Sequence, residues 1–150
     1  MSATQQEHDK RALIGYTIGC IIALSLIIFL ISYAANRKVL TCSYDLDLDD
    51  QTNEEMSVRF VWNYGKLTSG KTKVYYKTDE KITDEQIAEF KQAFENTGLY
   101  ENIEYGDFFS YQVKAEADFK LDKVAEAFGG DDYDTVKSTF ENQYLMTCDD

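Results

Sequence analysis

Residues 40–48 read LTCSYDLDL and alternate strictly between apolar and polar side chains. This period of two is typical of a strand with one face buried and the other in water. The predicted inward face carries Leu40, Cys42, Tyr44, Leu46 and Leu48, and the outward face carries Thr41, Ser43, Asp45 and Asp47. A polar turn at residues 49–53 leads into a second alternating segment with the inward side chains Met56, Val58, Phe60, Trp62 and Tyr64. Two such runs with a short polar connection predict an antiparallel hairpin.

Further patterned segments extend this predicted sheet and cover it. Gly65 and Gly70 bracket a second turn, after which a third strand is expected. The further segments expected are strands at 71–77, 103–105 and 109–119 and short helices near 124–128 and 133–140. With a longer helix at about 84–97, the order is β-β-β-α-β-β-α-α. This order predicts an α+β domain, an antiparallel sheet with helices on one face.

The helix expected at about residues 84–97 has specific signals at its ends. Thr83 is the predicted N-cap, and Gln86, three residues later, completes a capping box. Gly98 can adopt the left-handed conformation that ends a helix. Apolar side chains recur between these ends at helical spacing: Ile87, Phe90 and Phe94. We therefore expect Phe90 to pack against the sheet, on the same covered face that buries Trp62.

Residues 12–35 form a stretch of 24 residues without a charged side chain. About 20 apolar residues suffice to cross roughly 30 Å of hydrocarbon, so a transmembrane helix is predicted at 12–36. It separates an N-terminal tail (1–11) from a domain at 39–150. The alternative is a cleaved signal peptide, because Ser32-Tyr33-Ala34 resembles a cleavage site. The stretch is longer than the usual apolar region of about 7–15 residues, which favours an uncleaved signal anchor.

The flanks and one face of this helix bear on topology and assembly. Basic pairs stand at both ends, Lys10-Arg11 and Arg37-Lys38, so flanking charge does not decide the orientation. Small residues recur every four positions, which can let two membrane helices approach closely enough to form a homodimer. They are Gly15, Gly19 and Ala23.

The predicted domain is strongly acidic. Residues 39–150 contain 25 Asp and Glu against 11 Lys and Arg, a net charge of −14. Such a domain repels phosphate backbones and anionic headgroups, which argues against nucleic acid and acidic lipid as partners.

Two cysteines stand at opposite ends of the domain, Cys42 and Cys148, whereas Cys20 lies within the apolar stretch. A disulfide between Cys42 and Cys148 is favoured over two unrelated buried thiols, and it predicts an extracytoplasmic domain. The bridge requires the chain before Cys148 to return to the first strand. The apolar segment Tyr144-Leu145-Met146 is expected to do so by packing on the core.

Few residues suggest chemistry. The single histidine, His8, lies outside the domain, which argues against a His-based catalytic or metal site there. Asp45, Asp47 and Asp49 invite a calcium interpretation, but an EF-hand needs Gly at Asp50 and Glu at Met56. The three carboxylates could hold an ion weakly, although a solvated, aggregation-resistant face is favoured. We expect no cofactor.

Five lysines stand within residues 66–81 of this acidic domain: Lys66, Lys71, Lys73, Lys77 and Lys81. They could form a docking edge for an anionic wall polymer or an acidic partner. Protection of an edge strand against aggregation is the favoured explanation, because lysine commonly has that role.

The overall plan resembles a known group of proteins. Lys10-Arg11, the apolar span and Arg37-Lys38 precede Leu40-Thr41-Cys42, and the domain ends in Tyr144-x-x-x-Cys148. This plan resembles uncharacterised single-pass envelope proteins of low-GC Gram-positive bacteria. The domain order is also similar to that of small YehR-like lipoproteins, although their lipobox is missing here. The resemblance implies an extracytoplasmic domain and carries over no catalytic residues.

These observations favour a non-enzymatic, membrane-anchored extracytoplasmic module that binds an envelope protein or a wall polymer. The alternative is a carboxylate-based hydrolase that acts on an envelope polymer. That chemistry needs one acid in an apolar pocket and a second within about 5–10 Å. A deep pocket of this kind would favour the enzyme, and an exposed apolar or basic surface would favour the binding module.

Overall fold

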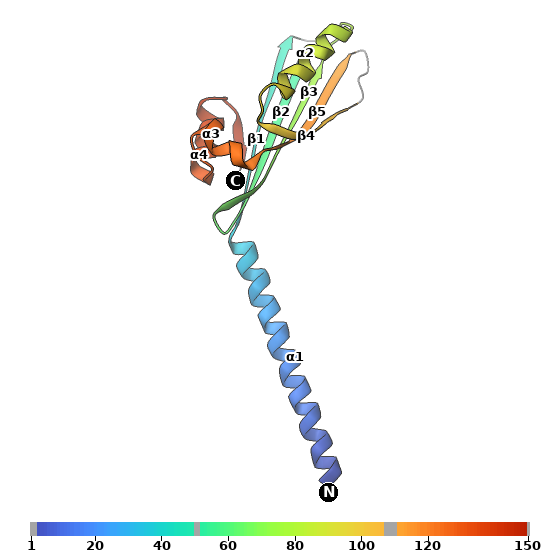
Figure 1. Cartoon of the computed structure of the whole chain (residues 1–150), viewed down its shortest axis with the longest axis vertical. Helices are drawn as coiled ribbons and strands as arrows, with labels where there is room; N and C mark the ends of the chain where they lie inside the picture. The colour runs from blue at the N-terminus through green and yellow to red at the C-terminus, as the bar shows by residue number, and fades with distance from the viewer. Residues whose placement is uncertain (1–2, 50–51, 107–110, 150) are drawn as a thin grey trace. The chain divides into compact units, whose positions relative to one another are not determined.

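The computed structural model describes residues 3–49, 52–106 and 111–149. The chain divides into two compact units, one up to Asn36 and one from Arg37 onward. The first unit is a single helix, α1 (Ala3–Ala35), which runs unbroken through the predicted apolar span (Figure 1). Its segment Gly15–Ala35 is long and apolar enough to cross a membrane, and none of it is buried against the rest of the protein.

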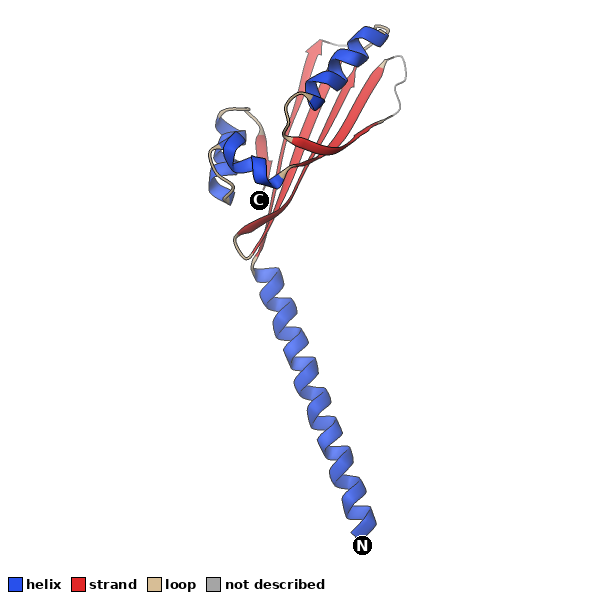
Figure 2. Cartoon of the chain, viewed as in Figure 1, coloured by secondary structure: helices blue, strands red, loops and turns tan. Residues whose placement is uncertain are grey.

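The second unit contains a six-stranded antiparallel sheet, counted over the residues described, with helices on one face (Figure 2). Its elements are β1 (Arg37–Asp49), β2 (Thr52–Asn63), β3 (Lys66–Lys77), α2 (Asp84–Glu95), β4 (Tyr100–Tyr105), β5 (Gln112–Phe119), α3 (Leu121–Phe128), α4 (Tyr133–Asn142) and β6 (Thr147–Asp149). The strand order is β4-β5-β3-β2-β1-β6. The predicted α+β class is confirmed, and only β6 was not foreseen.

The predicted inward faces of β1 and β2 are confirmed around Leu40, Cys42 and Phe60, but Leu46 is 48% exposed, and the side chain of Leu48 lies outside what the structure describes. Cys42 lies opposite Val58, and both side chains are buried. Tyr64 was wrongly placed on the inward face, because it lies in the following turn and is 56% exposed. Tyr64 and Gly65 both have positive φ, 51° and 76°. Two such residues form the tight hairpin turn whose twist matches that of the flanking strands.

Gly70 does not bracket a turn, as the sequence suggested, but lies inside β3. It is the register partner of Phe60, whose ring crosses over it. A Cβ atom at residue 70 would lie 2.7 Å from the Phe60 ring. The glycine is therefore required by close packing, and β3 begins at Lys66, immediately after the turn.

Helix α2 starts as predicted and ends slightly earlier. Thr83 accepts a hydrogen bond from the Gln86 amide at 3.2 Å, and the Gln86 side chain accepts one from the Thr83 amide at 2.9 Å. The C-cap is Asn96, and Gly98 takes the left-handed conformation in the turn that follows. All twelve residues of α2 are described, and none is buried. Phe90 lines a cavity with Tyr76 of β3 and Val113 of β5, so it borders the sheet as predicted, but its side chain is only half-buried.

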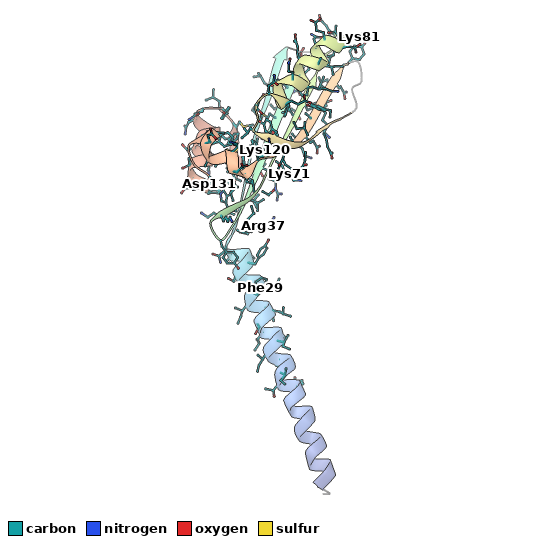
Figure 3. The ribbon with its side chains drawn as sticks, viewed as in Figure 1. Phe29, Arg37, Lys71, Lys81, Lys120 and Asp131 are labelled. Carbon is teal, nitrogen blue, oxygen red and sulfur yellow. A yellow bond between two sulfur atoms is a disulfide. The ribbon has the colours of Figure 1, made fainter. Side chains whose placement is uncertain are left out.

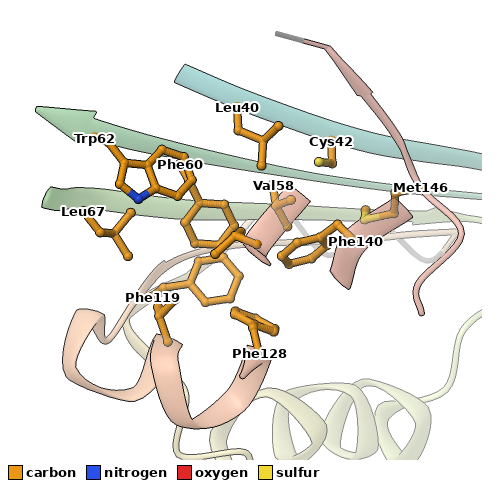
Figure 4. Packing of buried hydrophobic residues seen from close by; sticks show 12 residues of the cluster. Leu40, Cys42, Val58, Phe60, Trp62, Leu67, Phe119, Phe128, Phe140 and Met146 are labelled. Carbon is orange, nitrogen blue, oxygen red and sulfur yellow. The ribbon is translucent and has the colours of Figure 1, made fainter. Parts of the chain in front are cut away.

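The core lies between the sheet and the pair α3–α4 (Figure 4). The Phe60 ring lies at its centre, with ring centroids of Phe119 and Phe140 at 4.8 and 5.6 Å. Trp62 is buried as predicted, and its indole nitrogen donates a hydrogen bond to the carbonyl of Asp131 at 2.7 Å. This bond ties the loop between α3 and α4 to the sheet.

The C-terminal segment adds the short edge strand β6 beside β1. Cys42 lies opposite Cys148 in this pairing, and the two form a disulfide with a Cα–Cα distance of 4.0 Å. This is the pairing that the placement of the two cysteines predicted. Met146 is buried as expected, but Leu145 is 81% exposed. Only part of the apolar segment before Cys148 therefore returns to the core.

Candidate functional site

The three aspartates of the ion-binding hypothesis lie on β1. The regular pairing of β1 with β2 is interrupted between Asp47 and Asp49, so the three positions do not continue one regular face. Asp45 is exposed and accepts a hydrogen bond from the Asn53 amide at 2.6 Å. The side chains of Asp47 and Asp49 lie outside what the structure describes. Among the described residues, no group of three or more His, Cys, Asp or Glu could hold a metal ion.

Most lysines of the docking hypothesis do not lie at an edge of the sheet. Lys66, Lys71, Lys73 and Lys77 all belong to β3, which has β5 on one side and β2 on the other. Edge protection is therefore wrong for Lys71, Lys73 and Lys77, whereas Lys66 lies beyond the part of β3 that pairs with β5. Lys66 and Lys77 stand at opposite ends of a 12-residue strand, roughly 36 Å apart at about 3.3 Å per residue. Figure 3 shows Lys71 and Lys81 well separated too, so the lysines form no single patch.

The central lysines form ion pairs across the sheet. Lys71 lies opposite Asp118 and Lys73 opposite Glu116 in the register of β3 with β5. The nitrogen–oxygen distances are 3.7 and 3.3 Å, and Lys114 approaches Glu116 to 3.0 Å. Hydrogen bonds from Lys114 and Lys73 lower the pKa of Glu116. Opposite charges that face each other stabilise strand pairing, which explains lysines on an interior strand.

A broad groove crosses the sheet face opposite the helices. We call this cavity of about 610 Å³ the open-face groove, and it contains the register partners Asp45 and Glu55. Both carboxylates are exposed, and Lys73 and Lys114 also line the groove. A glycosidase acid needs apolar surroundings to stay protonated. This acid pair therefore does not meet the requirement set for the hydrolase alternative.

An apolar cavity opens on the opposite face, where the helices lie. We call it the aromatic cleft, a cavity of about 190 Å³. Its walls come from four strands, from α3 and α4, and from segments before β4 and β6. They are formed by Tyr44, Met56, Leu99, Tyr100, Phe119, Phe128, Phe140, Tyr144 and Met146. Apolar walls with few polar groups are typical of binding sites in proteins.

Three tyrosines supply the polar groups of the aromatic cleft. The Tyr44 hydroxyl donates a hydrogen bond to a carboxylate oxygen of Glu54 at 2.5 Å. Burial and this neighbouring carboxylate raise the pKa of Tyr44 to about 12. Burial, together with nearby Tyr144, also raises the pKa of Tyr100. Tyr44 and Tyr100 are thus neutral at physiological pH and offer hydroxyl groups beside an apolar surface.

Replacing Tyr44 by Phe should reduce the loss of stability at high pH. Because folding raises the pKa of Tyr44 from 10.0 to about 12, the unfolded chain loses this proton first. The contribution of the protonated Tyr44 hydroxyl to the free energy of unfolding is complete below about pH 10 and is lost as the pH rises through about 12. Denaturation at about pH 9 and about pH 11 should show that the free energy of unfolding falls more for the wild type than for Tyr44→Phe. Equal declines would contradict this, and Tyr111→Phe serves as the control.

Local sequence patterns do not reveal the aromatic cleft. The alternation of β1 and β2 did predict that Tyr44 and Met56 face inward. The apolar segment Tyr144-Leu145-Met146 is the sequence signal that could have indicated the cleft, but the sequence predicts that the whole segment packs on the core. Tyr144 instead remains 52% exposed at the mouth of the cleft.

The fold and these surfaces define an acidic α+β domain, closed by a disulfide and preceded by an apolar helix. No family model, curated protein or solved structure matches this chain.

Proposed function

We propose that this chain is a membrane-anchored extracytoplasmic module that binds an envelope protein and catalyses no reaction. The observation that carries the binding function is the aromatic cleft, a preformed apolar cavity that remains open to solvent through Tyr144. Large exposed apolar surfaces and apolar cavities on a folded domain are typical of interaction sites.

The anchor and the compartment have separate support. Gly15–Ala35 has the length and composition of a membrane span. The Cys42–Cys148 disulfide suits an oxidising compartment, because cytosolic thiols are kept reduced. The resemblance to single-pass envelope proteins also supports a membrane-anchored domain in an extracytoplasmic compartment. In this arrangement the N-terminus is inside and the domain is outside.

A hydrolase that uses carboxylates is less well supported. The open-face groove brings Asp45 and Glu55 together, but both side chains are exposed beside lysines. A homodimer through Gly15, Gly19 and Ala23 stays a prediction of the sequence, and the binding function does not depend on it.

Labelling of introduced cysteines tests the topology. In a Cys20→Ser background, a Lys81→Cys variant should react with a membrane-impermeant maleimide on intact spheroplasts, because residue 81 is exposed on the domain. A Gln5→Cys variant, on the tail beyond the span, should react only after lysis. Cys42 and Cys148 do not compete, because their sulfurs are bonded to each other. The reverse pattern of labelling would place the domain in the cytoplasm and refute the proposal.

Crosslinking in cells tests the binding function. A photoreactive amino acid at Leu145, which is 81% exposed beside the cleft, should capture a discrete partner. The same group at Tyr111, which is 49% exposed away from the cleft, is the matched control. Identical products from both positions, or none from either, would count against a partner at the cleft.

A further inference from the structure

The aromatic cleft lies among acidic helices. Phe94 of α2 stacks on Tyr100 in the cleft wall, with ring centroids 5.2 Å apart. Helix α2 carries four acids and one lysine, and residues 120–142, which include α3 with its N-cap Lys120 and α4, carry six acids and three lysines. The helices that border the cleft therefore carry a net negative charge, and Glu54, which accepts the hydrogen bond of Tyr44, adds a carboxylate at the cleft wall itself.

The size of the cleft indicates what it can hold. Its volume of about 190 Å³ lies below the range of roughly 300–1,000 Å³ that is usual for small-molecule sites. A cavity of this size accommodates one or two apolar side chains. Aromatic and aliphatic anchors that fill such pockets commonly dominate protein interfaces.

Apolar surface continues around the mouth of the cleft. Tyr144 and Leu145 are 52% and 81% exposed, and Leu145 has a positive φ of 54°. Leu46, two residues from Tyr44 along the same face of β1, is 48% exposed. Backbone strain of this kind at a bulky residue commonly occurs at functional sites. An extended partner segment would bury these side chains together with its anchor.

We propose that the aromatic cleft binds a basic protein segment that presents an apolar anchor side chain between lysines or arginines. This inference rests on the proposed binding function and names the partner class. Charge complementarity selects the partner, because positive groups beside the anchor would face the acidic helices. The domain of a second copy, residues 39–150, would bring another net charge of −14 against this surface, and an anionic wall polymer would be repelled as well.

Peptide titrations test this partner class on the full chain in phosphatidylcholine nanodiscs, whose lipid carries no net charge. The probe is a fluorescent peptide with a central Phe-Leu pair flanked by lysines, and binding is read by fluorescence anisotropy. One matched peptide has serines in place of Phe-Leu, and another has glutamates in place of the lysines. We expect the serine peptide to bind at least about tenfold more weakly, as the loss of an anchor predicts. The glutamate peptide should not bind, and added salt should weaken the lysine peptide.

Two variants locate the binding. Tyr144→Ala should weaken binding of the Phe-Leu peptide by about tenfold, as truncation of an interface tyrosine commonly does. Tyr111→Ala, at a similarly exposed tyrosine outside the cleft, should leave it unchanged, and circular dichroism confirms that both variants fold. Equal binding of the Phe-Leu and serine peptides, or equal loss in both variants, would overturn the proposal.

The crosslinking experiment separates the two levels of inference. Capture of a partner at Leu145 without binding of the lysine peptide would overturn the basic partner class and leave the binding function standing. Capture of the same chain at Leu145 would replace the basic partner by a second copy and overturn the inference. Absence of capture together with absence of peptide binding would reject both the partner class and the binding function.

Discussion

Replacing Cys148 by serine should lower the free energy of unfolding by about 2–5 kcal/mol under oxidising conditions. The bridge joins residues 106 positions apart, so its removal greatly increases the freedom of the unfolded chain. On the chain-entropy view a loop of this length is worth about 4–5 kcal/mol. The strand β6 that carries Cys148 has only three residues, so little else holds it to β1. Fluorescence of the single tryptophan, Trp62, reports unfolding of the domain.

Cysteine and reductant controls make this result specific. Cys20→Ser should leave the unfolding of the domain unchanged, because Cys20 lies on α1 and carries no bond to the domain. A reductant should lower the stability of the wild type towards that of Cys148→Ser and have little effect on the variant itself. Equal stability of the wild type and Cys148→Ser without reductant would show that the disulfide does not stabilise the domain.

Phe60→Ala should cost about 3–5 kcal/mol, the range for removing a fully buried aromatic ring. Phe60 is 0% exposed, and its ring lies within 6.3 Å of the ring centroids of Trp62, Phe119, Phe128 and Phe140. The matched variant is Phe90→Ala on α2, where no side chain is buried. It should cost clearly less, since partial exposure leaves less apolar area to lose. Urea denaturation compares the two, and equal costs would contradict this account of the core.

A second substitution tests the contact between Phe60 and Gly70. Gly70→Ala alone should destabilise the domain, because the new Cβ atom would lie 2.7 Å from the Phe60 ring. In the Phe60→Ala background this clash disappears, so the cost of Gly70→Ala should fall. Residues in direct contact show such non-additive effects. Strict additivity of the two costs would mean that the ring does not rest on residue 70.

Local sequence patterns were sufficient for most individual elements. The alternation around Leu40 and Phe60 predicted β1 and β2 with their buried faces, because a period of two follows from strand geometry alone. Thr83 and Gln86 predicted the start of α2, since a capping box acts within one turn. The two cysteines of the domain predicted the bridge that the structure contains. The strand and helix predictions depend on residues close in sequence. The disulfide prediction depends on the domain having only two cysteines that could pair.

Contacts between distant segments were decided only by the tertiary structure. The period of an edge strand is the same as that of an interior strand, so alternation alone does not reveal that β5 lies beside the lysines of β3. The sequence predicts a turn at Gly70, because the packing partner that requires a glycine there, Phe60, lies on another strand.

The aromatic cleft depends more than any other feature on contacts between distant segments. Its walls come from four strands and two helices, and segments such as those around Tyr44, Tyr100 and Tyr144 are far apart in the chain. By itself the sequence determined the helix, the strands, the acidic charge and the cysteine pair, because these follow from composition and local periodicity. The position of the cleft follows instead from strand order and from how α3 and α4 pack, which non-local burial of apolar surface decides.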